Sequence, residues 1–94
     1  MNKSEAKAIL AAELQKLRTC SHAELVGRLL DTQEALEVTA ASGAWYQIEL
    51  QVFWDDEPGG DLRVLGSIDD GGWRAFLPLC SAFILAPDGS FVDE

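Results

Sequence analysis

Hydrophobic side chains recur every three or four residues over positions 1–30, which is the spacing of an amphipathic helix. Asn2 and Ser21 are each followed by a glutamate three positions later, the pattern of a capping box at a helix start. We therefore predict one helix over 3–18 and a second over 22–30, joined by a short turn.

Beyond position 31 the hydrophobic period changes from about 3.6 residues to two, which predicts strands with one buried face. The clearest alternation covers 46–54, where every even position is hydrophobic and the odd positions are mostly polar. Further strands are predicted over 36–39, over 62–68, on the far side of an Asp70-Gly71 turn, and over 82–85.

Two hairpins set the order of these strands. The Pro- and Gly-rich loop 55–61 closes the first, and Asp70-Gly71 has the signature of a two-residue type I′ turn. The first hairpin pairs Trp54 with Leu62, Val52 with Val64, Leu50 with Gly66 and Ile48 with Ile68. The second pairs Ile68 with Trp73, Gly66 with Ala75 and Val64 with Leu77. Both registers place the same residues on one face, and the small pair Gly66 and Ala75 predicts a depression that seats a helix.

The length of 94 residues suits a single domain, and the 48% hydrophobic composition suits a folded one. Helices that precede a run of strands are typical of a segregated α+β fold. We predict a helical hairpin over 1–30, packed on one face of a four- to five-stranded antiparallel meander over 31–94.

The formal net charge of −9 is unevenly distributed, with +2 over 1–30 and −11 over 31–94. Nucleic-acid backbones require clustered lysine and arginine, so this balance argues against nucleic acid as the main partner. A helix-turn-helix interpretation of 1–30 stays open as an alternative, with Arg28 as the one strong base-reading side chain of the second helix. The acidic region would serve solubility or attract a basic partner.

The sequence contains no apolar run approaching the roughly 18 residues that span a bilayer. The mixed-charge start and the short apolar stretch 9–12 do not form a secretory signal. We therefore expect a cytoplasmic protein with no membrane partner, in which Cys20 and Cys80 remain thiols.

The loop 55–61 is acidic and offers oxygen ligands for a hard cation. Its candidate ligands are Asp55, Asp56, Glu57 and Asp61. Their spacing is not that of an EF-hand, and turn-forming Asp and Gly account for the same composition. A divalent-metal-dependent binder or enzyme that uses this loop is therefore the alternative to a solvated turn.

Cys20, His22 and Cys80 supply three potential zinc ligands. Structural zinc sites present paired ligands from two knuckles, and the second pair is absent here. The sequence also lacks a Gly-rich phosphate loop, a nucleophile elbow and a zinc-protease motif. We therefore predict no catalytic residues and no cofactor, with Cys20 packed between the helices and His22 in an exposed first turn.

The sheet face turned away from the helices carries aromatic, aliphatic and arginine side chains, the composition of an interface core. This candidate interface consists of Trp45, Phe53, Arg63, Leu65, Arg74 and Phe76. Phe53 is expected opposite Arg63, within reach of a cation–π contact, and Leu65 opposite Phe76. The alternative is that the C-terminal tail covers this face. The sequence predicts a non-enzymatic protein-binding module, in the simplest version a homodimer and otherwise an adaptor or an inhibitor of the immunity type.

Overall fold

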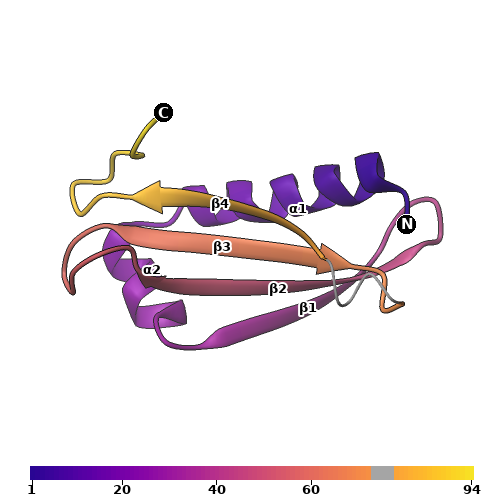
Figure 1. Cartoon of the computed structure of the whole chain (residues 1–94), viewed down its shortest axis with the longest axis horizontal. Helices are drawn as coiled ribbons and strands as arrows, with labels where there is room; N and C mark the ends of the chain where they lie inside the picture. Colours follow the sequence, from indigo (N-terminus) through magenta and orange to yellow (C-terminus); the bar gives the residue numbers. More distant parts are fainter. Residues whose placement is uncertain (73–77) are drawn as a thin grey trace.

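The computed structural model describes residues 1–72 and 78–94 of the chain (Figure 1). Within these residues the helices are α1 (Lys3–Arg18) and α2 (His22–Leu29), and the strands are β1 (Gln33–Thr39), β2 (Trp45–Trp54), β3 (Leu62–Asp69) and β4 (Leu79–Leu85). The strands form one antiparallel sheet in the order β1-β2-β3-β4. The predicted α+β fold, two N-terminal helices on a meander, is confirmed.

Both helices begin where the sequence predicted. The Asn2 side chain accepts a hydrogen bond of 3.0 Å from the Glu5 backbone N–H. At α2 the capping box is complete, because the Glu24 N–H donates to Ser21 Oγ at 3.1 Å and the Ser21 N–H donates to the Glu24 carboxylate at 3.2 Å. These bonds satisfy orphan N–H groups and fix the direction in which each helix leaves the preceding chain.

The core lies between the helices and one face of the sheet. Its sheet side is made by the even-numbered residues of β2 and β3, and its helix side by Ala6, Leu10, Leu14, Leu17, Leu25 and Leu29. At Gly66 the helix comes so close that an added Cβ would lie 2.9 Å from Leu10 Cδ1 and 3.1 Å from Leu14 Cδ2. Gly66 therefore forms the depression that was expected to seat a helix, and the helix is α1.

The register of β2 against β3 agrees with the prediction at every pair. Trp54 pairs with Leu62, Val52 with Val64, Leu50 with Gly66 and Ile48 with Ile68. This agreement follows from the strong alternation in both strands, since a slip of one residue would turn every buried side chain to solvent.

The predicted pairing beyond β3 is wrong. Gly66 pairs with Ser81 and not with Ala75, Val64 with Phe83 and not with Leu77, and Ile68 with Leu79 and not with Trp73. The three predicted partners lie outside the described residues. The aspartates at the end of β3 do form local turns, because Asp69 Oδ1 accepts from the Gly71 N–H at 2.8 Å. The place beside β3 that the two-residue hairpin would give to 73–77 is taken by Leu79–Leu85, whose Phe83 and Leu85 are buried in the core.

The C-terminal tail folds back along the outer edge of β4 on the helix side. Phe91 forms an isolated bridge with Leu85, and its ring meets the Phe83 ring edge-on at 5.7 Å between centroids. The Arg18 guanidinium lies 4.6 Å from the centroids of both rings and donates to the two Glu94 carboxylate oxygens at 2.8 and 2.7 Å. These contacts draw the tail towards α1 and away from the opposite face of the sheet.

Candidate functional site: the open face of the sheet

The face of the sheet that the two helices leave uncovered is called the open face. It is formed by the odd-numbered residues of β2 and β3, because side chains alternate along a strand and the even-numbered ones enter the core. In the described chain the open face comprises Gln33, Ala35, Glu37, Thr39, Trp45, Gln47, Glu49, Gln51, Phe53, Arg63, Leu65, Ser67, Asp69, Cys80, Ala82 and Ile84.

Trp45 and Phe53 mark the two ends of β2 on this face, and each is 38% exposed. Eight strand positions separate them, which corresponds to about 27 Å. An added Cβ at Gly71 would lie 2.6 Å from Trp45 Cζ3, so the indole packs against the chain that leaves β3. The open face therefore presents two separated aromatic positions along one strand.

Of the two pairs predicted around Phe53, one is present and the other is wrong. Phe53 does pair with Arg63, but the Arg63 guanidinium is turned to Asp55, which accepts from Nε at 2.8 Å and from Nη2 at 2.7 Å. Leu65 pairs with Ala82, so the predicted pair with Phe76 is wrong. Phe76 and Arg74 themselves lie outside the described residues.

Two residues of β4 that the sequence did not lead us to include in the candidate interface lie on the open face beside Leu65 and Arg63. Ala82 pairs with Leu65, and Ile84 pairs with Arg63 on the same face. The signal was present, because 79–85 alternates in the same way as the other strands, but the Asp70-Gly71 turn had assigned the place beside β3 to an earlier segment.

The half of the open face formed by β1 and β2 is polar and acidic. Gln33 donates a 2.7 Å hydrogen bond to Glu49, its diagonal neighbour across the two strands. Glu37 lies further along β1, opposite Gln47. Leu65, Ala82 and Ile84 thus lie beside Phe53, whereas the carboxylates of Glu37, Glu49 and Asp69 lie on β1, on β2 and at the far end of β3.

The acidic loop between β2 and β3 does not gather its carboxylates. Asp55 is engaged by Arg63, and the loop is closed by its own backbone, with the Asp55 N–H donating to the Asp61 carbonyl at 2.9 Å. Asp56 and Glu57 point into solvent. Within 1–72 and 78–94, no group of three or more His, Cys, Asp or Glu side chains is arranged to hold a metal ion.

Of the three candidate zinc ligands, Cys80 lies apart from the other two. His22 Nε2 is 2.8 Å from the Gly60 carbonyl oxygen, and its ring lies 5.9 Å from that of Trp54, at the β2–β3 hairpin. Cys80 pairs with Ser67, five strand positions or about 16 Å beyond the hairpin end of β3. Cys20 is half-buried near the start of α2, and both thiols are free. The expectation that His22 is exposed is wrong, because its ring is half-buried against the hairpin.

The helical hairpin is engaged by the rest of the molecule. His22 holds the first turn of α2 against the hairpin loop, and Arg28 forms an ion pair of 3.1 Å with Glu34 of β1. In a helix-turn-helix protein the first turn of the second helix would enter the major groove. Here that turn already contacts the chain's own sheet.

No family model, no curated protein and no solved structure matches this chain. Neither helix in the described part of the chain has the length and apolar content to cross a membrane. The functional inference therefore rests on the surfaces of the molecule itself.

Proposed function

We propose that this chain is a non-enzymatic protein-binding module and that the open face is its contact surface. The observation that carries the proposal is the exposure of Trp45 and Phe53 on the face that α1 and α2 leave uncovered, with Leu65, Ala82 and Ile84 nearby. Aromatic residues dominate the binding energy of protein interfaces, and large exposed ones in a small domain are a sign of a contact surface.

The charge of the molecule favours a basic partner over a second copy. The chain carries a net charge of −9, and the open face has Glu37, Glu49 and Asp69 against Arg63, whose charge is already balanced by Asp55. Two copies packed face to face would bring like charges together, which opposes association. A partner with a basic rim around an apolar centre would be steered to this face, as in an inhibitor or adaptor complex.

Site-specific cross-linking tests the proposal. A photoreactive phenylalanine analogue replaces Phe53 or, as the matched control, the exposed Ala23 of α2, and the native cell is irradiated. We expect a discrete adduct with a basic protein from position 53 and none from position 23. In the purified complex, Phe53→Ser should weaken binding by about 2 kcal/mol or more, which is the scale of an aromatic hot spot.

Sedimentation equilibrium of the purified chain decides between partners. A concentration-dependent dimer that Phe53→Ser and Trp45→Ser dissociate would replace the basic partner with a second copy. Equal cross-linking from positions 53 and 23, or unchanged affinity in both variants with an unchanged unfolding midpoint, would refute the open face as the contact surface.

A further inference from the structure

The two edge strands of the sheet differ in how they are protected. Edge strands expose backbone hydrogen-bonding groups, and charged side chains are a usual protection against unwanted pairing. β1 carries Glu34 and Glu37, whereas β4, Leu79–Leu85, carries no charged residue. Cys80, Ser81 and Ala82 are exposed. The first half of β4 is thus an uncharged and accessible edge.

The direction of the backbone groups of β4 follows from the tail. The Val92 N–H donates to the Ile84 carbonyl at 2.9 Å, and the Ala86 N–H donates to the Ser90 carbonyl at 2.8 Å. The even-numbered residues of β4 therefore direct their backbone N–H and C=O groups outward, and the odd-numbered residues form backbone hydrogen bonds with β3. By this alternation the N–H and C=O groups of Cys80 and Ala82 also point outward.

The C-terminal tail occupies only the second half of this edge. Phe91 and Val92 pair with Leu85 and Ile84, and the chain then leaves the strand direction at Asp93, whose φ is +64°. Glu94 continues to Arg18 on the helix side. The chain itself thus uses the outer edge of β4 to pair with an extended segment, and no segment within 1–72 or 78–94 pairs with 79–83 on that edge.

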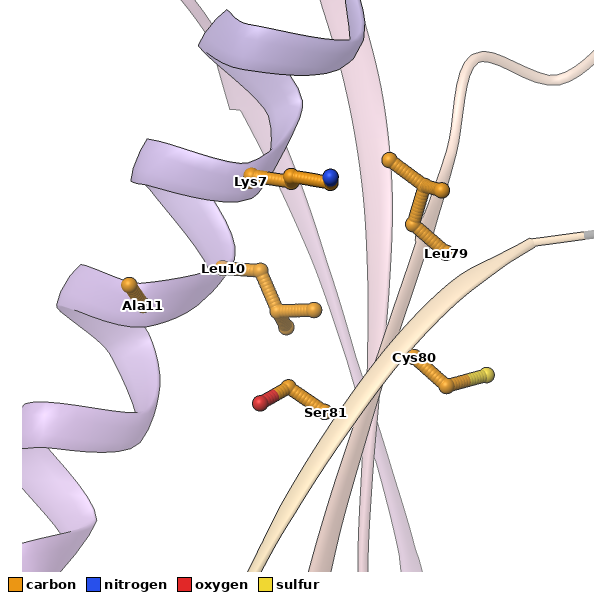
Figure 2. Close-up of a pocket in the computed structure, with 6 residues that line it drawn as sticks. All are labelled: Lys7, Leu10, Ala11, Leu79, Cys80 and Ser81. Carbon is orange, nitrogen blue, oxygen red and sulfur yellow. The ribbon is translucent and has the colours of Figure 1, made fainter.

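A cavity of about 300 Å³ lies beside this free half, between α1 and β4. It is lined by Lys7, Leu10, Ala11, Leu79, Cys80 and Ser81. Figure 2 shows the Ser81 hydroxyl directed towards α1 and the Cys80 sulfur directed to the other side of the strand. Because Ser81 is small, a side chain from a strand added next to β4 could reach across it into the cavity.

The charge beside the cavity is positive in an otherwise acidic protein. Among the described lining residues Lys7 carries the only charge, and Lys3 lies one turn earlier on the same side of α1. The opposite side of α1, towards β1, carries Glu5, which accepts hydrogen bonds from Ser42 and Tyr46. The edge of β4 therefore has a cationic neighbour and the edge of β1 an anionic one.

We propose that the free half of β4 binds an extended peptide segment with an acidic C-terminal end, by antiparallel strand addition. The segment would exchange main-chain hydrogen bonds with Cys80 and Ala82, which supply affinity, while a side chain in the cavity supplies specificity. An antiparallel segment runs opposite to β4, so its C-terminal end lies at Leu79, on the side of Lys7 and Lys3. This site is separate from the open face and does not depend on it.

The register of the bound segment is limited on both sides. Pro78 has no N–H to donate, and the Ile84 carbonyl is already taken by Val92. The residues opposite Cys80 and Ala82 therefore make the complete hydrogen-bonded pairs. The residue opposite Ser81 points to the helix side and enters the cavity, and the residue opposite Leu79 places a carboxylate near Lys7.

The test uses the full chain and a fluorescein-labelled peptide, Gly-Ser-Ile-Thr-Val-Thr-Glu with a free C-terminus, followed by fluorescence anisotropy. The Gly-Ser pair is an unpaired spacer that carries the label away from the docked tail, and only the last five residues lie opposite 79–83. The valine is placed opposite Ser81 and the last glutamate opposite Leu79. A matched peptide ends in glutamine amide and so lacks both carboxylates. A third has both threonine nitrogens methylated, and a fourth has the isoleucine and valine nitrogens methylated.

We expect the acidic peptide to bind and the glutamine amide peptide to bind about two- to fivefold more weakly, as for an exposed ion pair. Methylation of the threonines should weaken binding at least about tenfold, because their N–H groups face β4. Methylation of the isoleucine and valine, whose N–H groups face away from β4, should change the affinity of the peptide by no more than about twofold.

Variants of the chain test the same contacts. Ala82→Pro removes an outward N–H without removing a bond to β3, and should weaken binding about three- to tenfold with an unchanged unfolding midpoint. Lys7→Gln should remove the preference for the acidic peptide, whereas Lys16→Gln, which affects a cation paired with Glu13, should leave it unchanged. Phe53→Ser should bind the peptide as the unsubstituted chain does.

The proposal is overturned by any of four results, three of them from peptide binding. In the first, the acidic peptide does not bind at 1 mM. In the second, methylation of its threonines and the Ala82→Pro substitution both leave its affinity unchanged. In the third, Phe53→Ser abolishes its binding, which would place the peptide on the open face. Sedimentation equilibrium adds a fourth, a dimer that Ala82→Pro dissociates, since a second copy would then occupy the edge.

Discussion

The close approach of α1 to the sheet at Gly66 makes a quantitative prediction about stability. A Cβ at this position would lie 2.9 Å from Leu10 Cδ1 and 3.1 Å from Leu14 Cδ2, both closer than ordinary contact. Alanine gains roughly 0.5–1 kcal/mol over glycine within a strand, but overpacking a core costs about 1–3 kcal/mol. We expect Gly66→Ala to lower the free energy of unfolding by about 1 kcal/mol and Gly66→Val by about 3 kcal/mol.

Urea denaturation measures both changes, and a second glycine provides the control. At Gly27 of α2 an added Cβ meets nothing within 4 Å, so Gly27→Ala should raise the free energy of unfolding by about 1 kcal/mol through helix propensity. A double-mutant cycle with Leu10→Ala then isolates the contact. In that background the cost of Gly66→Val should fall by about 1–2 kcal/mol, because Cδ1 is gone.

Two results would refute this reasoning. The first is a Gly66→Ala variant that is as stable as the unsubstituted chain or more so, which would mean that Leu10 and Leu14 move aside at no cost. Alternatively Gly66→Val could cost the same with and without Leu10→Ala, and the loss would then arise in the backbone of β3 and not in its contact with α1.

Three further predictions concern the ends of the core and the acidic loop. His22→Ala removes the bond to the Gly60 carbonyl and should cost about 1 kcal/mol, with faster amide hydrogen exchange confined to the β2–β3 hairpin. The hydrogen bond that Tyr46 donates to Glu5 raises the Tyr46 pKa, so wild-type stability should fall as the pH rises above about 10, and Tyr46→Phe should abolish this fall. Ca²⁺, Mg²⁺ and Zn²⁺ at millimolar concentration should leave the unfolding midpoint unchanged, because the 55–61 loop does not gather its carboxylates.

The difference between β2 and β4 shows what sequence patterning can and cannot determine. Alternation specifies which side chains enter the core, and the short loop 55–61 leaves one register for β2 against β3. Alternation cannot distinguish registers that differ by an even number of residues. The partner of Gly66 is Ser81 and not Ala75, a shift of six positions that the alternation alone could not detect.

The candidate site was affected by the same ambiguity. Trp45, Phe53, Arg63 and Leu65 were assigned correctly to the open face, because each follows from its parity within β2 or β3. Their neighbours were less predictable, since the direction of the Arg63 guanidinium depends on Asp55, which belongs to the loop. The position of the tail could not be read from the sequence either, because it depends on contacts with Arg18 across most of the chain length.

Arg18 is the residue on which the position of the tail depends. Its guanidinium lies over the rings of Phe83 and Phe91 and forms two hydrogen bonds with Glu94, a bidentate geometry that lysine cannot reproduce. Arg18→Lys keeps the charge but loses the planar contact with both rings. We therefore expect Arg18→Lys to weaken the docking of the tail nearly as much as Arg18→Gln does.

The pH dependence of this contact has a definite sign. The hydrogen bonds from Arg18 lower the pKa of Glu94, so the carboxylate contributes to docking at neutral pH and loses that contribution as the pH falls through its depressed pKa. The Val92 N–H, which donates to the Ile84 carbonyl, reports docking locally through hydrogen exchange. Its protection should decrease on acidification in the unsubstituted chain and stay constant in Glu94→Gln, once intrinsic exchange is allowed for. Equal protection of Val92 at pH 7 and pH 3 in the unsubstituted chain would show that Phe91 alone docks the tail.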